Sequence, residues 1–521
     1  MQSSLTDELA WATLERAAAA HPDRDFLRFR EGAVSYANFA EGARDYAARF
    51  ARFGVRQGDV APTFFPNGLP AAATGFALMR LGAVWAPINT EFRGEQLVRA
   101  LNMTGASVIV VDQPYLETIV SVLPALEHVR SVIVHGCDAP QAMGEVRFAR
   151  LEQLPGGPAP SIANVSRADV AMIQFTSGST GVSKAVQLSH GYLVGQARLT
   201  SKYFDLKAGD VVYCPFPLYH WDATIGTVMG ALVRGATAAL ADRFSVSRFW
   251  DDVRAFEATM FDFMGATLTF LFERPPTVQD RDHKVRLAWG LPMPEFRAAF
   301  EERFGFPLLE GYGSTEGGVC VFQKLSESYP KGSCGRLAPE FELKLVDDDD
   351  EPVAVGEVGE IVTRPHDRTL MMNGYLNMPE VNAELIRDGW YHTGDLGRLD
   401  ADGNLYFAGR KKDIIRRRGE NISALEIERE VASHPAVIEA AAFGVPSPFT
   451  EEDVAVAIVV RPGAQLSEDE LRSYCEGRMA RYMAPRHIFI VDALPKTPTE
   501  KVAKAELKRQ FADATKGGDT A

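Results

Sequence analysis

The sequence has few cysteines and none of the spacings that bind zinc or build a disulfide framework. The five cysteines stand far apart, with no C-x-x-C pair, at Cys137, Cys214, Cys320, Cys334 and Cys475. A small, odd and scattered set is typical of proteins from reducing compartments. We therefore expect a cytoplasmic protein without a structural zinc site.

An excess of positive charge and a long apolar run are also missing. The 55 basic and 69 acidic residues give a net charge of −14, which argues against nucleic acid or an anionic membrane surface as the main partner. No run of 18 apolar residues occurs, and the apolar stretch at 70–89 is broken by Arg80 and Pro87. We expect no membrane span, and the charged N-terminal segment does not resemble a signal peptide.

Short apolar runs instead alternate with helix-patterned stretches. Buried strands of a mostly parallel sheet are expected at 107–112, 131–135 and 170–175, with helices at 92–103 and 295–304. Repeated alternation of this kind predicts an α/β fold in which a large N-terminal domain is built from layered α/β subdomains.

A change of character near residues 409–413 predicts a domain boundary, because the basic stretch KKDIIRRRGENIS begins there. Beyond it we expect helices at 424–434 and 468–481 and strands at 454–460 and 487–491, the size of a compact domain. The predicted domains are therefore 1–411 and a small, mobile α+β unit at 412–521.

The segment FTSGSTGVSKAVQLSH, at residues 175–190, nearly matches a Walker phosphate loop. Gly178 and Lys184 stand where that motif has its first Gly and its Lys. Ser183 and Ala185, however, replace its second Gly and the Ser or Thr that binds magnesium.

The flanking residues argue further against a Walker loop. A Walker loop leads directly into a helix whose N-terminus holds the phosphate. Here strands are expected at 170–175 and 185–188, and Ser189 is placed to cap a helix from His190. The segment is expected to join two strands, while its hydroxyls, backbone amides and one ammonium still suit a triphosphate.

Three further motifs follow in order along the chain. GYGSTE at 311–316 brings together an aromatic ring, a hydroxyl and a carboxylate. YHTGDL at 391–396 puts a carboxylate in a turn and is followed by Gly409-Arg410, and LPKTPTEK at 494–501 puts a lysine in a loop. Taken together, these motifs resemble the adenylate-forming superfamily of acyl-CoA synthetases, adenylation domains and luciferases, from about Leu14 to Leu507.

The resemblance implies a role for each matching residue. The triphosphate of ATP would be held by Thr176, Ser177, Gly178, Ser179, Thr180, Gly181 and Lys184. The adenine pocket would contain Gly290, Leu291, Pro292, Gly311, Tyr312 and Gly313, with the Tyr312 ring stacked on the base. Thr315 would bond the α-phosphate, Glu316 would hold Mg²⁺, and Asp395 would bind the ribose with help from Arg410. Lys501 would be the catalytic lysine that bridges the acid and the α-phosphate.

For the second half-reaction, the resemblance implies rotation of the C-terminal domain about Lys412. Gly419 and Glu420 would then line a tunnel for the thiol. The acid pocket would contain His220, Trp221, Asp222, Met264 and Gly265. PLYHWDA, FMGA and DIIRRRGENIS most resemble the crotonobetaine/carnitine-CoA ligase branch.

These roles predict an ATP-dependent acid–CoA ligase that activates a small or medium carboxylic acid through acyl-AMP, with ATP, Mg²⁺ and CoA as its cofactors and cosubstrates. Since a carboxylate is already ionised near neutral pH, the reaction needs positioning of anions and no protein nucleophile. Two alternatives remain: an enzyme that loads a carrier protein, and a nucleotide-binding regulator without turnover. The assembly is left open, with a homodimer as one alternative.

Structural roles stand beside several of these assignments. Trp221 and Asp222 would favour a cationic acyl group, or else serve as packing and a helix cap. The basic residues at 411–418 belong to a solvated face or meet the phosphates of CoA, and the aspartates at 347–350 form an exposed turn.

Four residues depart from the family pattern: Ser183 for Pro, Ala185 for Gly, Arg418 for Gly and Glu500 for Gly. We expect Glu500 either to raise the pKa of its neighbour Lys501 or to draw the ammonium away from the site.

Overall fold

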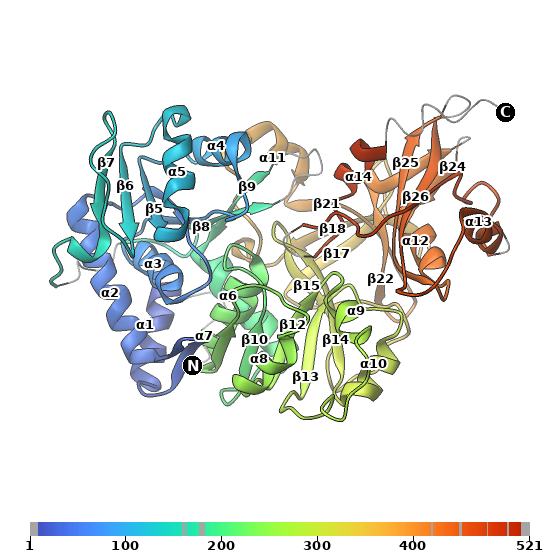
Figure 1. Ribbon diagram of the computed structural model, residues 1–521, viewed down its shortest axis with the longest axis horizontal. Helices are drawn as coiled ribbons and strands as arrows, with labels where there is room; N and C mark the ends of the chain where they lie inside the picture. The colour runs from blue at the N-terminus through green and yellow to red at the C-terminus, as the bar shows by residue number, and fades with distance from the viewer. Residues whose placement is uncertain are drawn as a thin grey trace.

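The computed structural model describes residues 9–158, 161, 164–176, 183–417, 420–447, 451–476, 478–497 and 500–511. Figure 1 shows a large α/β body, coloured blue to yellow, with the orange and red C-terminal part packed beside it. The predicted fold, a large N-terminal part of layered α/β structure and a small α+β C-terminal part, is confirmed. Within the described residues, no helix combines the length and the apolar character needed to cross a membrane.

The first sheet has eight strands in the order β19-β9-β8-β4-β3-β5-β6-β7. In that order they span Gly374–Tyr375, Lys184–Ser189, Val170–Thr176, Val84–Pro87, Val60–Phe64, Val108–Asp112, Ser131–His135 and Arg147–Arg150. The strands from β8 to β7 pair in parallel, while β9 is antiparallel to both β8 and β19.

The second sheet has fourteen strands, with the main order β17-β18-β21-β22-β16-β15-β14-β13-β12-β10-β11-β1-β2 and β20 beside β21. In that order the main strands span Phe341–Val346, Val358–Pro365, Trp390–Leu399, Asn404–Arg410, Gly335–Leu337, Gly318–Phe322, Leu308–Ser314, Leu287–Leu291, Met260–Met264, Val211–Cys214, Thr237–Leu240, Asp25–Phe29 and Gly32–Ser35, and β20 spans Ile386–Arg387. The run from β14 to β1 is parallel, and the β14–β15 pair begins an antiparallel half. The strands predicted at 107–112, 131–135 and 170–175 are β5, β6 and β8 of the first sheet, so the expectation of a mostly parallel sheet is confirmed there. The antiparallel half of the second sheet was not predicted.

Helices fill the space between the two sheets and cover their outer faces. The main hydrophobic core unites residues of both sheets with helices α1 (Ala10–Ala20), α2 (Tyr36–Phe53), α3 (Leu69–Arg80), α6 (His190–Tyr203), α7 (Gly230–Arg234) and the π-helix η4 (Asp222–Met229). Outside the sheets pack α4 (Gly94–Met103) and α5 (Leu116–Val122) on one, and α8 (Phe249–Ala255), α9 (Thr267–Phe272) and α10 (Arg297–Phe304) on the other. Period-two alternation along the strands separates these faces.

The smaller elements complete the large part. Helix α11 spans Pro379–Leu385, and 3₁₀ turns lie at Gln113–Tyr115, Leu123–Ala125, Leu151–Gln153, Arg368–Leu370 and Lys411–Asp413.

The strands around the phosphate-loop candidate form as the sequence predicts. β8 and β9 flank residues 177–182, which lie outside the described residues, and pair antiparallel with Thr176 opposite Lys184. Ser189 caps α6 by accepting a hydrogen bond from the Tyr192 amide at 3.0 Å. The segment therefore joins two strands, as expected, and does not lead into a helix.

The C-terminal part has two small sheets. They are the hairpin β23–β24 (Ile414–Arg417 and Glu420–Ser423) and the sheet β25-β26-β27 (Val437–Pro446, Glu452–Val460 and His487–Ile490). Helices α12 (Ala424–Ala432), α13 (Glu468–Glu476) and α14 (Lys504–Phe511) pack around them. The helix predicted at 468–481 ends at Glu476, where the sequence continues with Gly477, a residue that favours helix ends. The helix predicted at 424–434 ends at Ala432.

Candidate active site

The carboxylate of Glu316 lies near both ends of the phosphate-loop candidate. The Thr176 hydroxyl, at the end of β8, donates to Glu316 Oε1 at 3.3 Å. The Tyr375 hydroxyl donates to the same oxygen at 2.8 Å, and its ring lies 4.6 Å from the Lys184 ammonium. The structure thus brings Thr176, Lys184 and Glu316 together, whereas Ser177, Gly178, Ser179, Thr180 and Gly181 lie outside the described residues.

Tyr375 is a site residue that the sequence motifs missed. It reaches Glu316 because the two-residue strand β19 pairs with β9, with Tyr375 opposite Val186. That pairing joins segments about 190 residues apart in the sequence, and no local pattern signals it.

The second carboxylate, Asp395, lies between a guanidinium and a phenol. Asp395 on β21 and Arg410 on β22 are direct register partners, and Arg410 Nε lies 3.3 Å from Asp395 Oδ1. The Tyr312 hydroxyl donates to Asp395 Oδ2 at 2.9 Å. Burial raises the pKa of Asp395, while Arg410 and the Tyr312 hydrogen bond oppose that rise. The three residues assigned to adenosine therefore form one connected group.

A cavity of about 1310 Å³ opens beside this group, between the N-terminal and C-terminal parts. From the predicted site it is lined by Leu291, Pro292, Gly311, Tyr312, Gly313, Asp395, Arg410, Lys412 and Lys501. The Leu291–Pro292 peptide bond is cis. This volume exceeds that of a typical small-molecule pocket, so it has room for a nucleotide.

Gly290 is not part of the cavity lining. A Cβ atom added to Gly290 would lie 1.9 Å from the carbonyl oxygen of Phe263. In place of the predicted role in the adenine pocket, Gly290 has a packing role. Because it lacks a side chain, it lets β13 approach β12 closely.

Lys501 reaches this site from the C-terminal part. Desolvation and the nearby guanidinium of Arg410 lower the pKa of Lys501, while the carboxylates of Asp222, Asp395 and Glu316 act in the opposite direction. The three carboxylates stand far apart in the sequence, in η4, in the β14–β15 turn and on β21, and all three act on the charge of Lys501. The orientation of the C-terminal part is thus one that places the lysine in the N-terminal site.

The expectation for Glu500 is wrong. Its charged neighbours are Lys496 and Glu439, and burial raises the pKa of Glu500 itself. The pKa of Lys501 is lowered, not raised, by burial and by the charge of Arg410. Glu500 has a φ of +59°, in the left-handed region where glycine is favoured. That backbone turn directs the two side chains to different surroundings.

The acid-side residues His220, Trp221 and Asp222 lie where β10 leads into the π-helix η4. Burial and the charge of Lys501 lower the pKa of His220 to about 3, so this imidazole is neutral at physiological pH. The Trp221 indole donates to the Tyr192 hydroxyl at 3.1 Å, and that hydroxyl donates to the Thr315 carbonyl at 2.7 Å. The tryptophan is thereby tied to the GYGSTE motif.

Met264 ends strand β12, and Gly265 follows it. Met264 is buried in the main core, and Gly265 adopts a φ of +52° and donates its amide to the Leu291 carbonyl at 3.2 Å. In the β12–β13 pair, Met264 is the register partner of Leu291.

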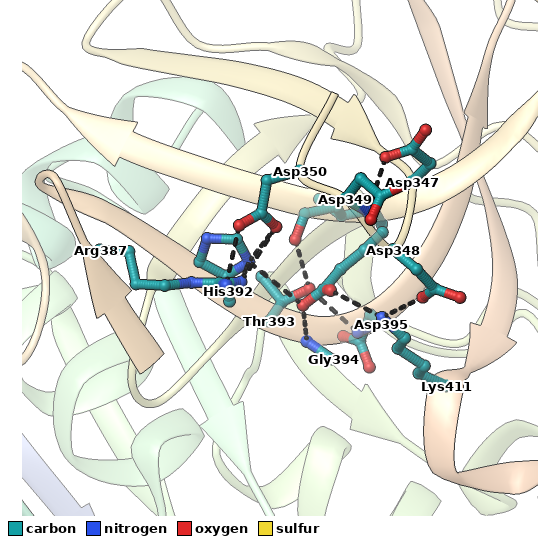
Figure 2. Close-up of polar contacts among 12 residues, drawn as sticks. Asp347, Asp348, Asp349, Asp350, Arg387, His392, Thr393, Gly394, Asp395 and Lys411 are labelled. Carbon is teal, nitrogen blue, oxygen red and sulfur yellow. Dashed lines mark hydrogen bonds and ion pairs between the residues drawn. The ribbon is translucent and has the colours of Figure 1, made fainter. Parts of the chain in front are cut away.

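The linker to the C-terminal part begins with an ion-pair network, shown in Figure 2. Lys411 Nζ lies 2.7 Å from Asp348 Oδ1 and 3.4 Å from Glu360 Oε2. Glu360 Oε1 also accepts from the Gly394 amide at 3.1 Å, next to Asp395. These ion pairs anchor Lys411 to the N-terminal part. The next residue, Lys412, takes no part in this network.

Two charged segments make contacts that the sequence did not predict. The aspartates at 347–350 form the expected exposed turn, and in addition they pair with Lys411 and Arg387. Arg417 donates to the carbonyls of Tyr482 and Ala484 at 2.8 and 3.2 Å, so it is a structural contact of the C-terminal part.

Glu310 on β14 is a buried carboxylate in the cavity wall. It is 7% exposed, and its Oε1 accepts from the Met293 amide at 3.0 Å. Burial raises the pKa of Glu310 to about 7. A carboxyl group with a raised folded-state pKa contributes stability at acid pH that is lost as the pH rises through that pKa.

We therefore expect Glu310→Gln to gain stability over the parent protein as the pH rises from 5 to 8.5, by on the order of 2–3 kcal/mol. Unfolding by urea at pH 5, 7 and 8.5 measures the difference. Glu302→Gln, at an exposed position on α10, serves as the control. A difference between Glu310→Gln and parent that does not change with pH would contradict the assignment.

Two family models match the chain. The model for the AMP-binding enzyme matches residues 14–376, and the model for the AMP-binding enzyme C-terminal domain matches residues 426–501. The chain belongs to the AMP-binding enzyme family. The resemblance to adenylate-forming enzymes is thereby confirmed.

Full-length relatives of this AMP-binding enzyme include the crotonobetaine/carnitine–CoA ligase of Salmonella typhi. It is 30% identical over 505 residues, which cover 94% of this chain and 97% of the relative. The predicted enzyme class, an AMP-forming acid–CoA ligase, is confirmed at this level.

Solved structures show the same fold over nearly the whole chain. An anthranilate CoA ligase in complex with anthranoyl-AMP has a TM-score of 0.89 at 24% identity, and 98% of each chain is covered. The o-succinylbenzoate CoA synthetase of Bacillus subtilis, in complex with its acyl-adenylate intermediate, has a TM-score of 0.82 at 25% identity and covers 96% of this chain and 98% of its own.

Proposed function

We propose that this AMP-binding enzyme activates a small or medium carboxylic acid with ATP to give an acyl-AMP, and then transfers the acyl group to CoA. AMP and pyrophosphate are released. The observation that carries the proposal is the position of Lys501. This lysine lines the same cavity as Tyr312, Asp395 and Arg410, and its ammonium is attracted by Glu316 and Asp222.

In the first step, an oxygen of the acid carboxylate attacks the α-phosphorus of ATP and pyrophosphate leaves. The carboxylate is ionised at neutral pH, so no base has to remove a proton. The main barrier is the approach of two anions, and the Lys501 ammonium bridges them. Binding of these anions favours the charged form of Lys501 and opposes the desolvation that lowers its pKa.

The adenosine would be fixed by the connected group of Tyr312, Asp395 and Arg410. Asp395 offers its carboxylate to the ribose hydroxyls, and the charge of Arg410 opposes the rise in the pKa of Asp395 that burial causes. Thr176 and Lys184, together with the loop between them, hold the leaving pyrophosphate, and Thr315 contacts the α-phosphate.

Mg²⁺ fits the residues near the triphosphate. The described part of the chain has no group of three or more His, Cys, Asp or Glu residues that could hold a metal ion. Glu316, beside Thr176, offers one carboxylate, which suits an ion that takes its remaining ligands from phosphates and water. When bound, Mg²⁺ supplies shielding of the phosphate charge.

In the second step, the CoA thiolate attacks the carbonyl carbon of acyl-AMP, and AMP leaves from that carbon. The thiol needs access to the side on which Lys501 now lies. We propose that the C-terminal domain, residues 412–521, rotates about Lys412 to withdraw Lys501 and present Gly419 and Glu420. Gly419 lies outside the described residues, and for Glu420 only the backbone is described.

Release of pyrophosphate from purified protein, measured across a panel of carboxylic acids with and without CoA, tests the proposal. We expect release only when an acid is present, and an acyl-CoA product only when CoA is added. An acyl-AMP that persists despite CoA would favour a carrier protein as acceptor. ATP binding without acid-dependent release for any acid would contradict the proposed activation.

A further inference from the structure

The two-residue strand β19 carries a tyrosine that contacts two charged residues assigned to the triphosphate. Tyr375 is 5% exposed and belongs to the main hydrophobic core. Its hydroxyl donates to Glu316 Oε1 at 2.8 Å, and its ring centroid lies 4.6 Å from Lys184 Nζ. Among the described residues, neither Lys184 nor Glu316 forms a direct ion pair. One buried side chain therefore contacts a cation and an anion that are not paired with each other.

The Tyr375 hydroxyl is a lasting hydrogen-bond donor. Burial raises the pKa of Tyr375, and so do the charge of Glu316 and the hydrogen bond to it. The phenol therefore stays protonated at neutral pH and donates its proton to the carboxylate. The face of its ring attracts an ammonium without neutralising it. Glu316 and Lys184 thus each have an uncharged partner and keep their full charge.

The backbone of Tyr375 is fixed by a side chain of helix α11. β19 is the edge strand of its sheet and pairs with β9 alone. Asn382 Oδ1 accepts from the Tyr375 amide at 2.7 Å, and Asn382 Nδ2 donates to the Tyr375 carbonyl at 2.9 Å. The carboxamide has one acceptor and one donor group, so it bonds the peptide groups that a further strand would otherwise bond. Gly374, with a φ of +130°, permits this approach, because a Cβ atom there would lie 2.9 Å from Asn382 Nδ2.

The segment around β19 also holds the main chain next to both charged residues. The Met372 amide donates to the carbonyl of Glu316 at 2.8 Å. The Leu376 amide donates to the carbonyl of Ala185, the residue after Lys184, also at 2.8 Å. These bonds fix the tyrosine relative to the two residues that its side chain contacts.

Metal-bound ATP needs the two charges separately, since Lys184 is assigned to phosphate oxygens and Glu316 to Mg²⁺. A lysine and a glutamate within reach of each other attract and form an ion pair. Such a pair would have to be broken each time the nucleotide binds. A neutral group that holds both side chains removes that competition.

We infer that Tyr375, held by Asn382, is a positioning residue of the triphosphate site: its hydroxyl orients the Glu316 carboxylate, and its ring keeps the Lys184 ammonium from pairing with that carboxylate before ATP binds. The inference rests on the proposed function, which assigns Lys184 to the triphosphate and Glu316 to Mg²⁺. Tyr375 acts through these two residues.

The role of the hydroxyl is tested by calorimetric titration of ATP without any acid, once in EDTA and once over a range of Mg²⁺ concentrations. Tyr375→Phe removes the hydroxyl and keeps the ring. We expect metal-free ATP to bind within about twofold of the parent, and the Mg²⁺ concentration for half of the gain in affinity to rise by about 10–100-fold, as is typical when a group that orients a metal ligand is lost. Tyr36→Phe, which removes a buried hydroxyl that bonds the Ala231 and Ala236 carbonyls, is the control and keeps the parent's Mg²⁺ requirement.

The role of the ring is tested with Tyr375→Leu, in which nothing keeps Lys184 from Glu316. We expect metal-free ATP to bind about two- to fivefold more weakly than to Tyr375→Phe, the factor that corresponds to a partly exposed ion pair. Adding Glu316→Gln removes the pairing partner. The gain in metal-free ATP affinity from Glu316→Gln should therefore be larger in Tyr375→Leu than in the parent, and equal gains would overturn the role of the ring.

The contribution of Asn382 is tested with Asn382→Asp, which keeps an acceptor for the Tyr375 amide and loses the donor to its carbonyl. We expect a raised Mg²⁺ requirement, as in Tyr375→Phe. Because Asn382 acts through Tyr375, the double variant should require no more Mg²⁺ than Tyr375→Phe alone. Additive effects of the two substitutions would contradict this dependence.

Thermal unfolding shows whether each variant is folded, and Asn382→Asp decides if Tyr375→Phe is not. An unchanged Mg²⁺ requirement in the folded variant would overturn the inference. Equal losses of affinity with and without Mg²⁺, as a purely structural role would give, would also overturn it. Since no acid is present in these titrations, failure to activate any acid would contradict the proposed function and leave this result standing.

Discussion

Lys501→Ala is expected to lower acid-dependent pyrophosphate release by about 10²–10³-fold, the loss typical when one group that stabilises a charged transition state is removed. The structure places the Lys501 ammonium among the carboxylates of Asp222, Asp395 and Glu316. Arg410 is already paired with Asp395. Release of pyrophosphate under single-turnover conditions gives the rate.

Thioester formation from supplied acyl-AMP and CoA should remain within a few-fold of the parent in the same variant, because that step needs the lysine withdrawn. Lys496→Ala is the matched control. Lys496 lies five residues earlier and pairs with Glu439, away from the site. Retained pyrophosphate release in Lys501→Ala, or equal losses in both half-reactions, would contradict the assignment.

The pH profile offers an independent check on Lys501. Because desolvation lowers its pKa, its ammonium is lost at a lower pH than that of an ordinary lysine. We expect kcat/KM for pyrophosphate release, which reports the free enzyme, to fall on the alkaline side below a pH of about 10.4. The residual activity of Lys501→Ala should lack this descending limb.

Lys412→Pro is expected to lower thioester formation from acyl-AMP and CoA by about 100-fold and to leave pyrophosphate release within a few-fold. Proline fixes φ near −65°, whereas a hinge residue must absorb a large change of backbone angles. Lys412 lies in the 3₁₀ turn Lys411–Asp413, a conformation whose φ proline adopts readily. The variant therefore holds the orientation seen in the structure, in which Lys501 is in the site.

Lys412→Ala is the control for loss of the side chain, since alanine keeps the backbone free. It should retain both half-reactions. The network around Lys411 makes position 412 a specific choice, because Lys411 is tied to Asp348 and Glu360. Equal effects of proline and alanine, or a loss of both half-reactions with proline, would remove Lys412 from the role of hinge.

Local patterns were sufficient for much of the fold. The strands at 107–112, 131–135 and 170–175 are found as β5, β6 and β8, and the helix expected after Ser189 is α6. These elements follow from apolar runs, a capping residue and spacing, which act within a few residues. The helix expected to reach residue 481 stops at Glu476, because element ends depend on local competition that a pattern describes poorly.

The sequence revealed those candidate site residues that stand in a motif. Asp395 and Arg410 come from separate motifs, and the β21–β22 register brings them to 3.3 Å. Tyr375 stands in no such motif. Its place in the site comes from strand pairing between distant segments, so the sequence alone offered no signal for it.

By itself, the sequence determined the order of the motifs, the α/β character, and an acidic chain of scattered cysteines without a long apolar run. Those properties are local or additive along the chain. Only the tertiary structure decided that Lys501 meets Asp222, Asp395 and Glu316, and that Glu500 turns away from it. The reason is physical: charges interact through distances in space, and these distances are set by strand register and domain orientation, which no short stretch of sequence contains.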